Sequence, residues 1–406
     1  MYKKNIKTIT NKRIFLFILS FVIWGCNKYY LTLSNNWGFP ILNTTESITY
    51  ENLLGTVLYN QDTASFPKYT KRNWQGIPSI GIDKYHHLYI TWFAGGSNEN
   101  GTSIGNYITM SISNNLGRTW YKNKIVIAPS DSDSDRFYDP SLFSDKYNNL
   151  YFSFSRDFPN KLSYDDGSRW LCGIQNTKVG LTPKLTEVRF WKKGVMIQKP
   201  AFALNDSSTM YFSIYEWLWT NGNHKPWIYK GVINDFNMQN LTPISYIPLE
   251  SRLRNFDETM VVQLKNNHFF AMIRGIDGLY TSESNDGINW DSCTKFISLG
   301  ATTSARFHLR RLKSGRLILI FNNDLTRTNL KAYLSDDEGK TWPYSVLIDN
   351  RKDVSYPDMV ELDGNLYISY DFDRYGKGKI NLVVIKESQI LSGDTNFFRT
   401  IVDSLR

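Results

Sequence analysis

Residues 356–370, YPDMVELDGNLYISY, determine how the fold is interpreted. Alternating β-forming residues flank the turn at Asp363-Gly364, which is the usual sequence signal of a β-hairpin. The same unit recurs along the chain as a β-rich run, a polar turn, and a second run that opens with an apolar or apolar–aromatic pair. The other copies are residues 77–93 (IPSIGIDKYHHLYITWF), 139–155 (DPSLFSDKYNNLYFSFS), 199–215 (KPAFALNDSSTMYFSIY), 257–274 (DETMVVQLKNNHFFAMIR) and 307–321 (FHLRRLKSGRLILIF).

The spacing of the six copies predicts how they assemble. Their second strands begin at Leu88, Leu150, Met210, Phe269, Leu317 and Leu366. A unit of roughly 50 to 60 residues is too small to bury both faces of its own sheet and must stack against its neighbours. We therefore predict an all-β fold, a six-bladed β-propeller that forms one domain over residues 46–406. A two-sheet sandwich is the alternative, but it would not require such regular spacing.

A second motif recurs in the outer hairpins. Residues 335–342 (SDDEGKTW) form a complete Asp-box, S-x-D-x-G-x-T-W, and related copies are residues 113–120 (SNNLGRTW), 283–290 (ESNDGINW) and 163–170 (SYDDGSRW). In such a turn the Asp or Asn side chain caps backbone N–H groups, and the Gly takes a left-handed conformation. The Trp is expected to pack under the hairpin. We expect these boxes to be structural and to lie away from the axis.

The N-terminus has the pattern of an export signal. Basic residues precede an apolar run at 14–24, and Gly25-Cys26 follows directly. Eleven apolar residues are too few to span a bilayer, so the segment is typical of a signal peptide. The Cys resembles the lipidated residue of a bacterial lipobox. We predict a lipoprotein signal over residues 1–26, a linker over 27–45, and a lipid on Cys26 that anchors the protein to a membrane of the cell envelope, on its periplasmic or cell-surface side. An ordinary secretory signal with an incidental Cys is the alternative.

Composition excludes several partners. The formal net charge is +9, but Lys3, Lys4, Lys7, Lys12 and Arg13 supply five of these charges before the apolar run. The remaining basic residues are scattered, so we expect no nucleic-acid partner. Cys172 and Cys293 lack a metal-ligand spacing and the chain has only 5 His, so we expect no metal and no cofactor. Aromatic residues make up 15% of the chain, which suits strands and stacking on sugars. We expect a monomer.

The repeat, the Asp-boxes and several spacings together resemble the sialidases over roughly residues 70–390. That resemblance implies a Tyr–Glu nucleophile pair, three arginines that hold a substrate carboxylate, and an acid/base Asp. Tyr356 opens the sixth unit, as the nucleophilic Tyr does, and Glu258 opens the fourth, as does its glutamate. A neutral Tyr is a poor nucleophile without a nearby base. A Tyr nucleophile also avoids the repulsion that a carboxylate would meet at the anomeric centre of an anionic sugar.

The arginine pattern matches only in part. Arg274 follows Glu258 by 16 residues, and Arg327 precedes the complete Asp-box; they resemble the second and third sialidase arginines. Two guanidinium groups aimed at one point suit a carboxylate. The first arginine, part of an Arg-Ile-Pro motif in sialidases, is missing. Gln75 or Gly76 stands in its place, before Ile77-Pro78. Glu99 is the candidate acid in place of the family's Asp.

Further polar residues lie near the ends of the predicted inner hairpins, and in a propeller these ends surround the channel. Each of them either contacts substrate or pairs across the channel. They are Asp139, Lys199, Arg306 and Asp358, followed by Asp257, Glu216, Asp371 and Arg374.

These residues favour a retaining exo-glycosidase acting on a terminal acidic sugar, either sialic acid or another carboxylate-bearing sugar such as a uronic acid, with a glycan as its partner. A polysaccharide lyase is a second possibility, with His308 or Tyr356 as the base. A non-catalytic glycan-binding lipoprotein is the third, because the fold does not fix the function. We also expect the ring to close by pairing of the termini. The sixth unit is one strand short after residues 380–386 (INLVVIK), and residues 48–59 (ITYENLLGTVLY) are unassigned.

Overall fold

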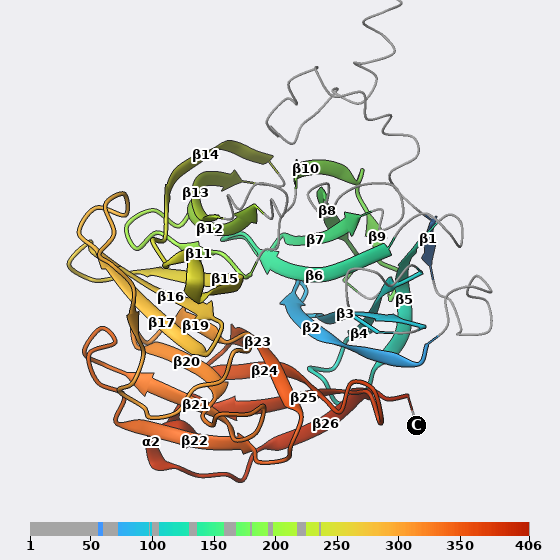
Figure 1. Cartoon of the computed structure of the whole chain (residues 1–406). Coiled ribbons are helices and arrows are strands. Elements are labelled where there is room, and N and C mark those ends of the chain that lie inside the picture. Colours follow the sequence, from blue (N-terminus) through green and yellow to red (C-terminus); the bar gives the residue numbers. More distant parts are fainter. Residues whose placement is uncertain are drawn as a thin grey trace, which may run out of the picture.

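The computed structural model describes residues 56–59, 72–96, 98–99, 105–129, 136–157, 168–178, 181–193, 198–216, 225–234 and 237–405. Over these parts of the chain, the strands form six antiparallel sheets of four or five strands. The sheets follow one another in chain order around a central axis, so that the first and last lie side by side (Figure 1). The predicted six-bladed β-propeller is therefore confirmed. We number the blades 1 to 6 in chain order.

The strands of blades 1 to 3 are as follows. Blade 1 comprises β1 (Thr56–Tyr59), β2 (Trp74–Ile82), β3 (Leu88–Gly95), β4 (Tyr107–Ser113) and β5 (Tyr121–Ala128). Blade 2 comprises β6 (Arg136–Ser144), β7 (Leu150–Asp157), β8 (Ser168–Gln175), β9 (Lys184–Leu185) and β10 (Arg189–Lys193). Blade 3 comprises β11 (Ala201–Phe202), β12 (Thr209–Glu216), β13 (Lys225–Asn234) and β14 (Asn237–Tyr246).

The strands of blades 4 to 6 continue the pattern. Blade 4 comprises β15 (Arg254–Gln263), β16 (Phe269–Gly275), β17 (Gly278–Ser284) and β18 (Thr294–Lys295). Blade 5 comprises β19 (His308–Arg311), β20 (Leu317–Asn322), β21 (Leu330–Ser335) and β22 (Tyr344–Asp349). Blade 6 comprises β23 (Val354–Leu362), β24 (Asn365–Phe372), β25 (Lys379–Lys386) and β26 (Phe398–Asp403), with α2 (Glu387–Ser392) between its last two strands. A short 3-10 turn (Ser251–Leu253) precedes β15.

The six predicted hairpins are the six innermost strand pairs, β2–β3, β6–β7, β11–β12, β15–β16, β19–β20 and β23–β24. An apolar cluster fills each junction between neighbouring blades. Phe143 and Phe212 pack between blades 2 and 3, for example, and Ile90 and Leu382 belong to the cluster between blades 1 and 6. The core therefore runs around the ring as a series of interfaces, which is how units with two apolar faces bury both of them.

The predicted closure of the ring was wrong. The described part of the N-terminal segment, β1, pairs with β5 and forms the outer edge of blade 1. Blade 6 completes itself with β26, which pairs with β25. Blades 1 and 6 instead meet through one backbone hydrogen bond, from Gln75 N–H to the Arg374 carbonyl at 3.1 Å, and through side chains. Asp403 of β26 forms ion pairs with Arg72 and with Lys122, the latter at 2.7 Å. The segment over residues 48–55, the signal sequence, the linker and Cys26 lie outside the described residues.

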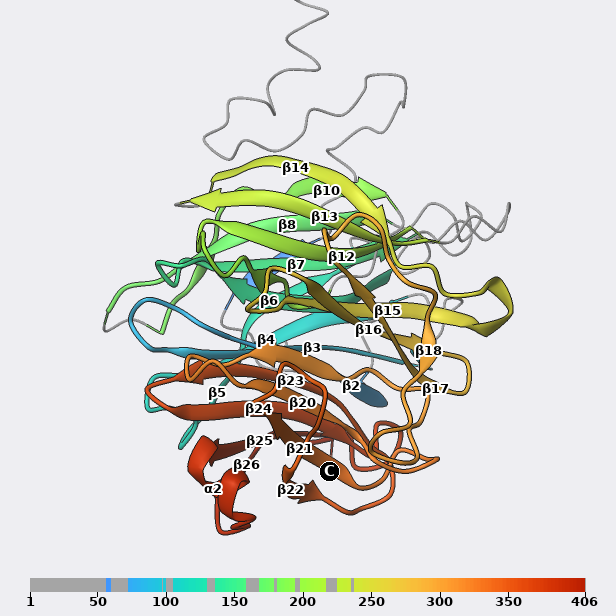
Figure 2. The same cartoon turned by 90° about the vertical axis from the view of Figure 1, so that its left-hand side faces the viewer.

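The Asp-boxes adopt the predicted turn. In residues 335–342, Asp337 Oδ1 accepts the backbone N–H of Thr341 at 2.8 Å, and the Ser335 hydroxyl accepts that of Gly339. Gly339 has φ +88°, and Trp342 is buried in the cluster between blades 4 and 5. These hairpins lie on the outside of the blades (Figure 2). Residues 163–167 of the fourth copy lie outside the described residues.

Candidate active site

At the start of four inner strands, an irregular backbone changes the direction of the side chains near the channel. The register between β23 and β24 shifts between Ser355 and Asp358, and Tyr356 inside this bulge has φ +55°. The same shift occurs in β2, β6 and β15, where Ile77, Asp139 and Asp257 have φ between +45° and +59°. Bulges redirect side chains and often border active sites. A left-handed conformation costs a residue other than glycine about 1–3 kcal/mol, so the surrounding structure must hold it.

Tyr356 and Glu258 are joined through one arginine. Arg274 Nη1 donates to the Tyr356 hydroxyl oxygen at 2.9 Å and to Glu258 Oε2 at 2.9 Å. Arg274 Nε donates to the Ser304 hydroxyl, and this hydrogen bond fixes the orientation of the guanidinium group. If Glu258 takes the proton of Tyr356 directly, the two side chains should share a hydrogen bond. Among the described residues no such bond forms, and the two oxygens meet at the same nitrogen instead.

Glu258 and Asp139 share a second arginine. Arg306 Nε donates to Glu258 Oε1 at 2.9 Å, and Arg306 Nη2 lies 3.3 Å from Asp139 Oδ1. Burial raises the pKa of Glu258, but the charges of Arg306 and Arg274 outweigh it and hold that pKa below its ordinary value. Burial likewise raises the pKa of Asp139, which Arg306 only partly offsets. The site therefore holds one ionised carboxylate beside one carboxyl whose ionisation is opposed.

Three guanidinium groups cover the ring of Tyr356. The guanidinium carbons of Arg374, Arg306 and Arg327 lie 4.1, 4.9 and 5.1 Å from its centroid. Arg327 differs from the other two, because its side chain makes no hydrogen bond or ion pair with any residue that the structure describes. It is partly exposed, so its donors are available to a ligand.

Arg374 fills the place of the missing first arginine. Gly76 precedes Ile77-Pro78 where sialidases have Arg, and a Cβ atom on Gly76 would lie 2.8 Å from Cγ, Cδ and Nε of Arg374. The arginine reaches this space from the turn after β24 in blade 6. Asp371 holds it there at 2.7 Å while also accepting the N–H of Ile77, and Ser355 accepts from Arg374 Nη2. The sequence signal that could have indicated this arrangement is a glycine before Ile77-Pro78 together with an arginine just after the second strand of the sixth unit.

Glu99 occupies the centre of the arginine group. Its carboxylate forms an ion pair with Arg374 Nη1, and Arg136 donates to its backbone carbonyl at 3.1 Å. Burial raises the pKa of Glu99, but the charges of Arg374, Arg327 and Arg274 lower it below its ordinary value. Three arginines therefore already act on a carboxylate at this point, which shows that the arrangement can hold one.

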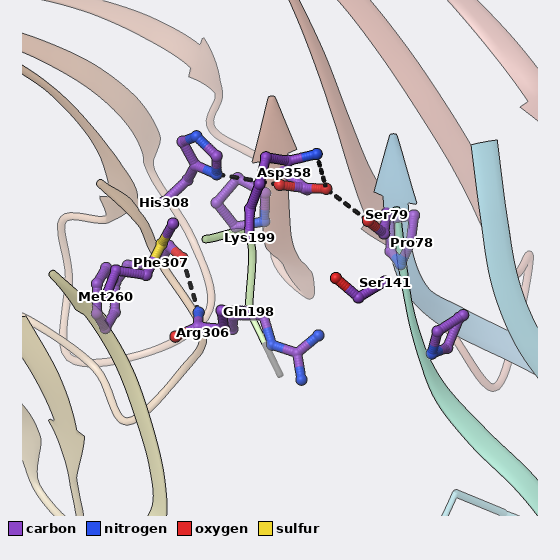
Figure 3. A pocket seen from close by; sticks show the side chains of 12 residues that line it. Pro78, Ser79, Ser141, Gln198, Lys199, Met260, Arg306, Phe307, His308 and Asp358 are labelled. Carbon is purple, nitrogen blue, oxygen red and sulfur yellow. Dashed lines mark hydrogen bonds and ion pairs between the residues drawn. The ribbon is translucent and has the colours of Figure 1, made fainter. Parts of the chain in front are cut away.

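Lys199 and Asp358 lie deeper in the channel, below this group, and pair with each other (Figure 3). Lys199 Nζ lies 3.1 Å from Asp358 and donates to the carbonyl oxygens of Ile80 and Leu142. His308 Nδ1 lies 3.1 Å from Asp358. The Nδ1 atom of His308, the candidate base of a lyase, is thus engaged by Asp358. These three residues join blades 3, 5 and 6 across the axis.

Gln75 also takes no part in the site. It is fully buried, its amide oxygen accepts from Arg72 and from Trp92 Nε1, and its amide nitrogen donates to the carbonyl of Gly378. Its polar atoms are therefore committed to the junction of blades 1 and 6. Over the described residues, no group of three His, Cys, Asp or Glu side chains could hold a metal ion. No helix among them is long and apolar enough to cross a membrane.

The fold and the Asp-box turns define a class of protein, the sialidase-like β-propellers with BNR repeats. Comparison with known families makes the assignment specific. Residues 86–368 match the BNR repeat-like domain, and the chain belongs to that family. No curated protein matches the sequence.

Solved structures with the same fold include several glycosidases. The Hadza microbial sialidase Hz136 superposes with a TM-score of 0.57 at 16% identity, covering 78% of this chain and 66% of its own, just under two thirds. The NanB sialidase from Streptococcus pneumoniae gives 0.56 at 12% identity, covering 86% and 72%. The GH93 α-L-arabinofuranosidase of Fusarium graminearum gives 0.54 at 14% identity, covering 80% and 96%. At these identities the similarity shows the fold and leaves the sugar open.

Proposed function

We propose that the protein is a retaining exo-glycosidase that removes a terminal acidic sugar from a glycan. One observation carries this proposal: the Tyr356 hydroxyl and the Glu258 carboxylate meet at one nitrogen of Arg274, under the guanidinium groups of Arg327 and Arg374. A potential nucleophile, a carboxylate base and donors for a substrate carboxylate thus converge at one point. The glycosidases that share the fold support the reaction class.

The substrate carboxylate would replace Glu99. Among the described residues, Arg327 has no hydrogen-bonding partner for its guanidinium group and Arg374 Nη1 binds only Glu99, so a sugar carboxylate could bind both in a forked geometry. The released Glu99 would lose its main positive neighbour, and its pKa would rise because burial still opposes the charged form. Substrate binding would therefore turn Glu99 into a proton donor for the leaving oxygen.

Tyr356 would then attack the anomeric carbon. Glu258 is ionised at neutral pH, as a proton acceptor must be, since Arg306 and Arg274 hold its pKa low. Arg274 stabilises the negative charge that develops on the phenol oxygen as its proton leaves. Water would release the sugar from Tyr356 in a second step, which retains the configuration of the anomeric carbon.

The test is hydrolysis of 4-methylumbelliferyl glycosides of N-acetylneuraminic acid and glucuronic acid, with the galactoside as a neutral control. We expect release from an acidic sugar only. Tyr356→Phe should abolish turnover and keep substrate binding, because it removes one hydroxyl and no charge. Tyr333→Phe is the matched control, since Tyr333 bonds Asn323 in blade 5. A second assay supplies a polymer with 4-linked uronate residues; an unsaturated uronate product there, without hydrolysis of either acidic glycoside, would replace the hydrolase by a lyase. Binding without turnover would leave a glycan-binding protein.

We also propose that Cys26 carries the lipid that anchors the protein to a membrane of the cell envelope. The support is the sequence pattern alone, a basic segment and an apolar run that end at Gly25-Cys26.

A further inference from the structure

A second cavity opens at the other end of the axial channel. It has a volume of about 430 Å³, and the closing residues of all six inner strands line it, among them Ile82, Phe202, Val262, Arg310 and Val360. The candidate active site lies where the same strands begin. Because the inner strands run in one direction around the ring, the two sites occupy opposite ends of the channel.

A layer of paired charges separates the two ends. Asp358 binds Lys199, His308 and the Ser79 hydroxyl, and these bonds cross the channel (Figure 3). Lys199 borders both the small space beneath Arg306 and the larger cavity. Its three donors are nevertheless used, since it also binds two backbone carbonyls. The second cavity is therefore a separate compartment with a polar floor.

Its wall carries an excess of positive charge. The basic side chains on it are Lys146, Lys199, Arg310, Arg311 and Lys313, and the acidic ones are Asp145 and Glu361. Most of these are engaged. Arg311 binds Glu338, and Asp145 caps the turn that follows β6. The rest of the wall is largely apolar, with Phe202, Val262 and Leu312 among its members.

Arg310 differs from the exposed Lys313, whose side chain also lacks a partner among the described residues, because Arg310 is partly buried. Its guanidinium carbon lies 5.7 Å from the centroid of Phe202, and it makes no hydrogen bond or ion pair with any residue that the structure describes. Burial lowers its pKa, although Asp358 and Glu361 act in the opposite sense. Both carboxylates bind other groups: Glu361 accepts the backbone N–H of Lys313, and Asp358 belongs to the layer below. Burying a cation without a paired anion costs free energy of folding. A partly buried, unpaired cation is therefore expected at a site where an anion binds.

We propose that this cavity binds a small organic carboxylate, with the carboxylate group on Arg310 and the apolar part against Phe202 and Val262. A guanidinium fork matches a carboxylate in shape and charge. One unpaired cation balances one negative charge, and Glu361 nearby disfavours a dianion such as phosphate. The apolar wall favours a ligand with a hydrophobic body over a bare ion.

Calorimetric titration of the purified protein with benzoate tests the proposal, with benzamide as the neutral isostere and inorganic phosphate as the dianion. Benzoate should bind at least tenfold more tightly than either control. Arg310→Met keeps an unbranched apolar stem and removes the charged guanidinium group, so benzoate binding should weaken at least tenfold. Arg310→Lys keeps the positive charge, so it should weaken benzoate binding less than Arg310→Met does. Arg327→Met, at the opposite end of the channel, should leave this binding unchanged and separates it from any binding at the candidate active site.

Three results would overturn the proposal: equal binding of benzamide and benzoate, unchanged affinity in Arg310→Met, or loss of binding in Arg327→Met alone. Thermal unfolding of each variant shows whether it is folded, and Arg310→Gln provides a second neutral variant if the Met variant is not. The inference is independent of the proposed glycosidase activity. Arg310→Met should hydrolyse the cognate glycoside at the rate of the unaltered protein.

Discussion

Moving one arginine between blades would test the central claim about the site. Arg374 is 5% exposed, pairs with Asp371 at 2.7 Å and contacts Glu99. Replacing it with Gly would remove one of the guanidinium groups that we propose for the substrate carboxylate. A hydrogen bond to a charged group contributes about 1.5–3 kcal/mol, so kcat/KM should fall about 10- to 150-fold. The same change leaves Asp371 without its cation, and breaking a buried pair costs about 3–5 kcal/mol. Asp371 keeps two other hydrogen bonds, which favours the lower figure.

The second step restores the arginine from blade 1. In Gly76→Arg alone, the new Cβ would lie 2.8 Å from three atoms of Arg374, so the two side chains cannot coexist as placed. Combined with Arg374→Gly, the new side chain can enter the vacated space from the position where sialidases carry their first arginine. We therefore expect both single variants to be impaired and the double variant to regain at least tenfold in kcat/KM over Arg374→Gly. Such non-additivity is the signature of two residues that share one space.

The assay is steady-state hydrolysis of the acidic 4-methylumbelliferyl glycoside, with urea unfolding to separate activity from stability. Arg351→Gly is a matched control, because Arg351 pairs with Asp349 outside the channel. Full activity in Arg374→Gly would show that this arginine does not hold the substrate. A double variant no better than Arg374→Gly would show that the space left by Gly76 is not equivalent to the missing arginine.

Three further predictions concern stability and location. The pKa of Asp257 is raised to about 6 by burial, against the opposing charge of Arg254. Because this lies above the unfolded value near 3.9, Asp257 stabilises the native state at low pH, and this contribution should fall by about 2 kcal/mol between pH 4 and pH 7; urea unfolding of Asp257→Asn should lack this loss. Lys199→Met should destabilise the ring by about 3–5 kcal/mol while the exposed Lys230→Met changes little, and equal effects would contradict a closing role for Lys199. Cys26→Ser should leave activity intact and shift the protein from the membrane to the soluble fraction, and unchanged partition would argue against a lipid there.

Local sequence patterns were enough to predict the blades. Each inner hairpin carries its own alternation and its own turn, as residues 356–370 do, so no long-range information was needed to find it. The approach of Tyr356, Glu258 and Arg274 was expected from the resemblance to the sialidases, whose motif positions these residues match, and the hydrogen bonds of Arg274 join the three. In a propeller the inner strands surround the channel, so residues at the same place on different inner strands lie at the same level of the channel.

Contacts between side chains that are far apart in the sequence could not be predicted from local patterns. Arg374 acts in the space next to Gly76, almost three hundred residues away in the chain, and no spacing rule joins them. Asp358 lies on the inner strand β23 and Lys199 lies just before β11, but the sequence did not show that their side chains bind each other across the channel. Gln75 faces a blade junction, because a residue next to a bulge does not follow simple alternation.

The last strand was missed for a related reason. The segment of β26, FRTIVD, is mostly exposed along its length, and only its final two residues are buried. An outer strand with one weakly apolar face gives little alternation to detect. The N-terminal segment over residues 48–59 has stronger β-forming residues, so it was expected to supply the missing strand of the sixth unit.

The bulged inner strands have a consequence for redesign. Ile77, Asp139, Asp257 and Tyr356 share one unusual backbone conformation at the same depth in four different blades, yet they carry an alkyl group, two carboxyls and a phenol. The frame thus tolerates different side chains at four related positions without any change in its strands. These are equivalent positions in four blades, and the strands around them do not depend on one kind of side chain. A polar or aromatic group could therefore be moved from one blade to another by substitution, and the backbone that receives it would already have the required conformation.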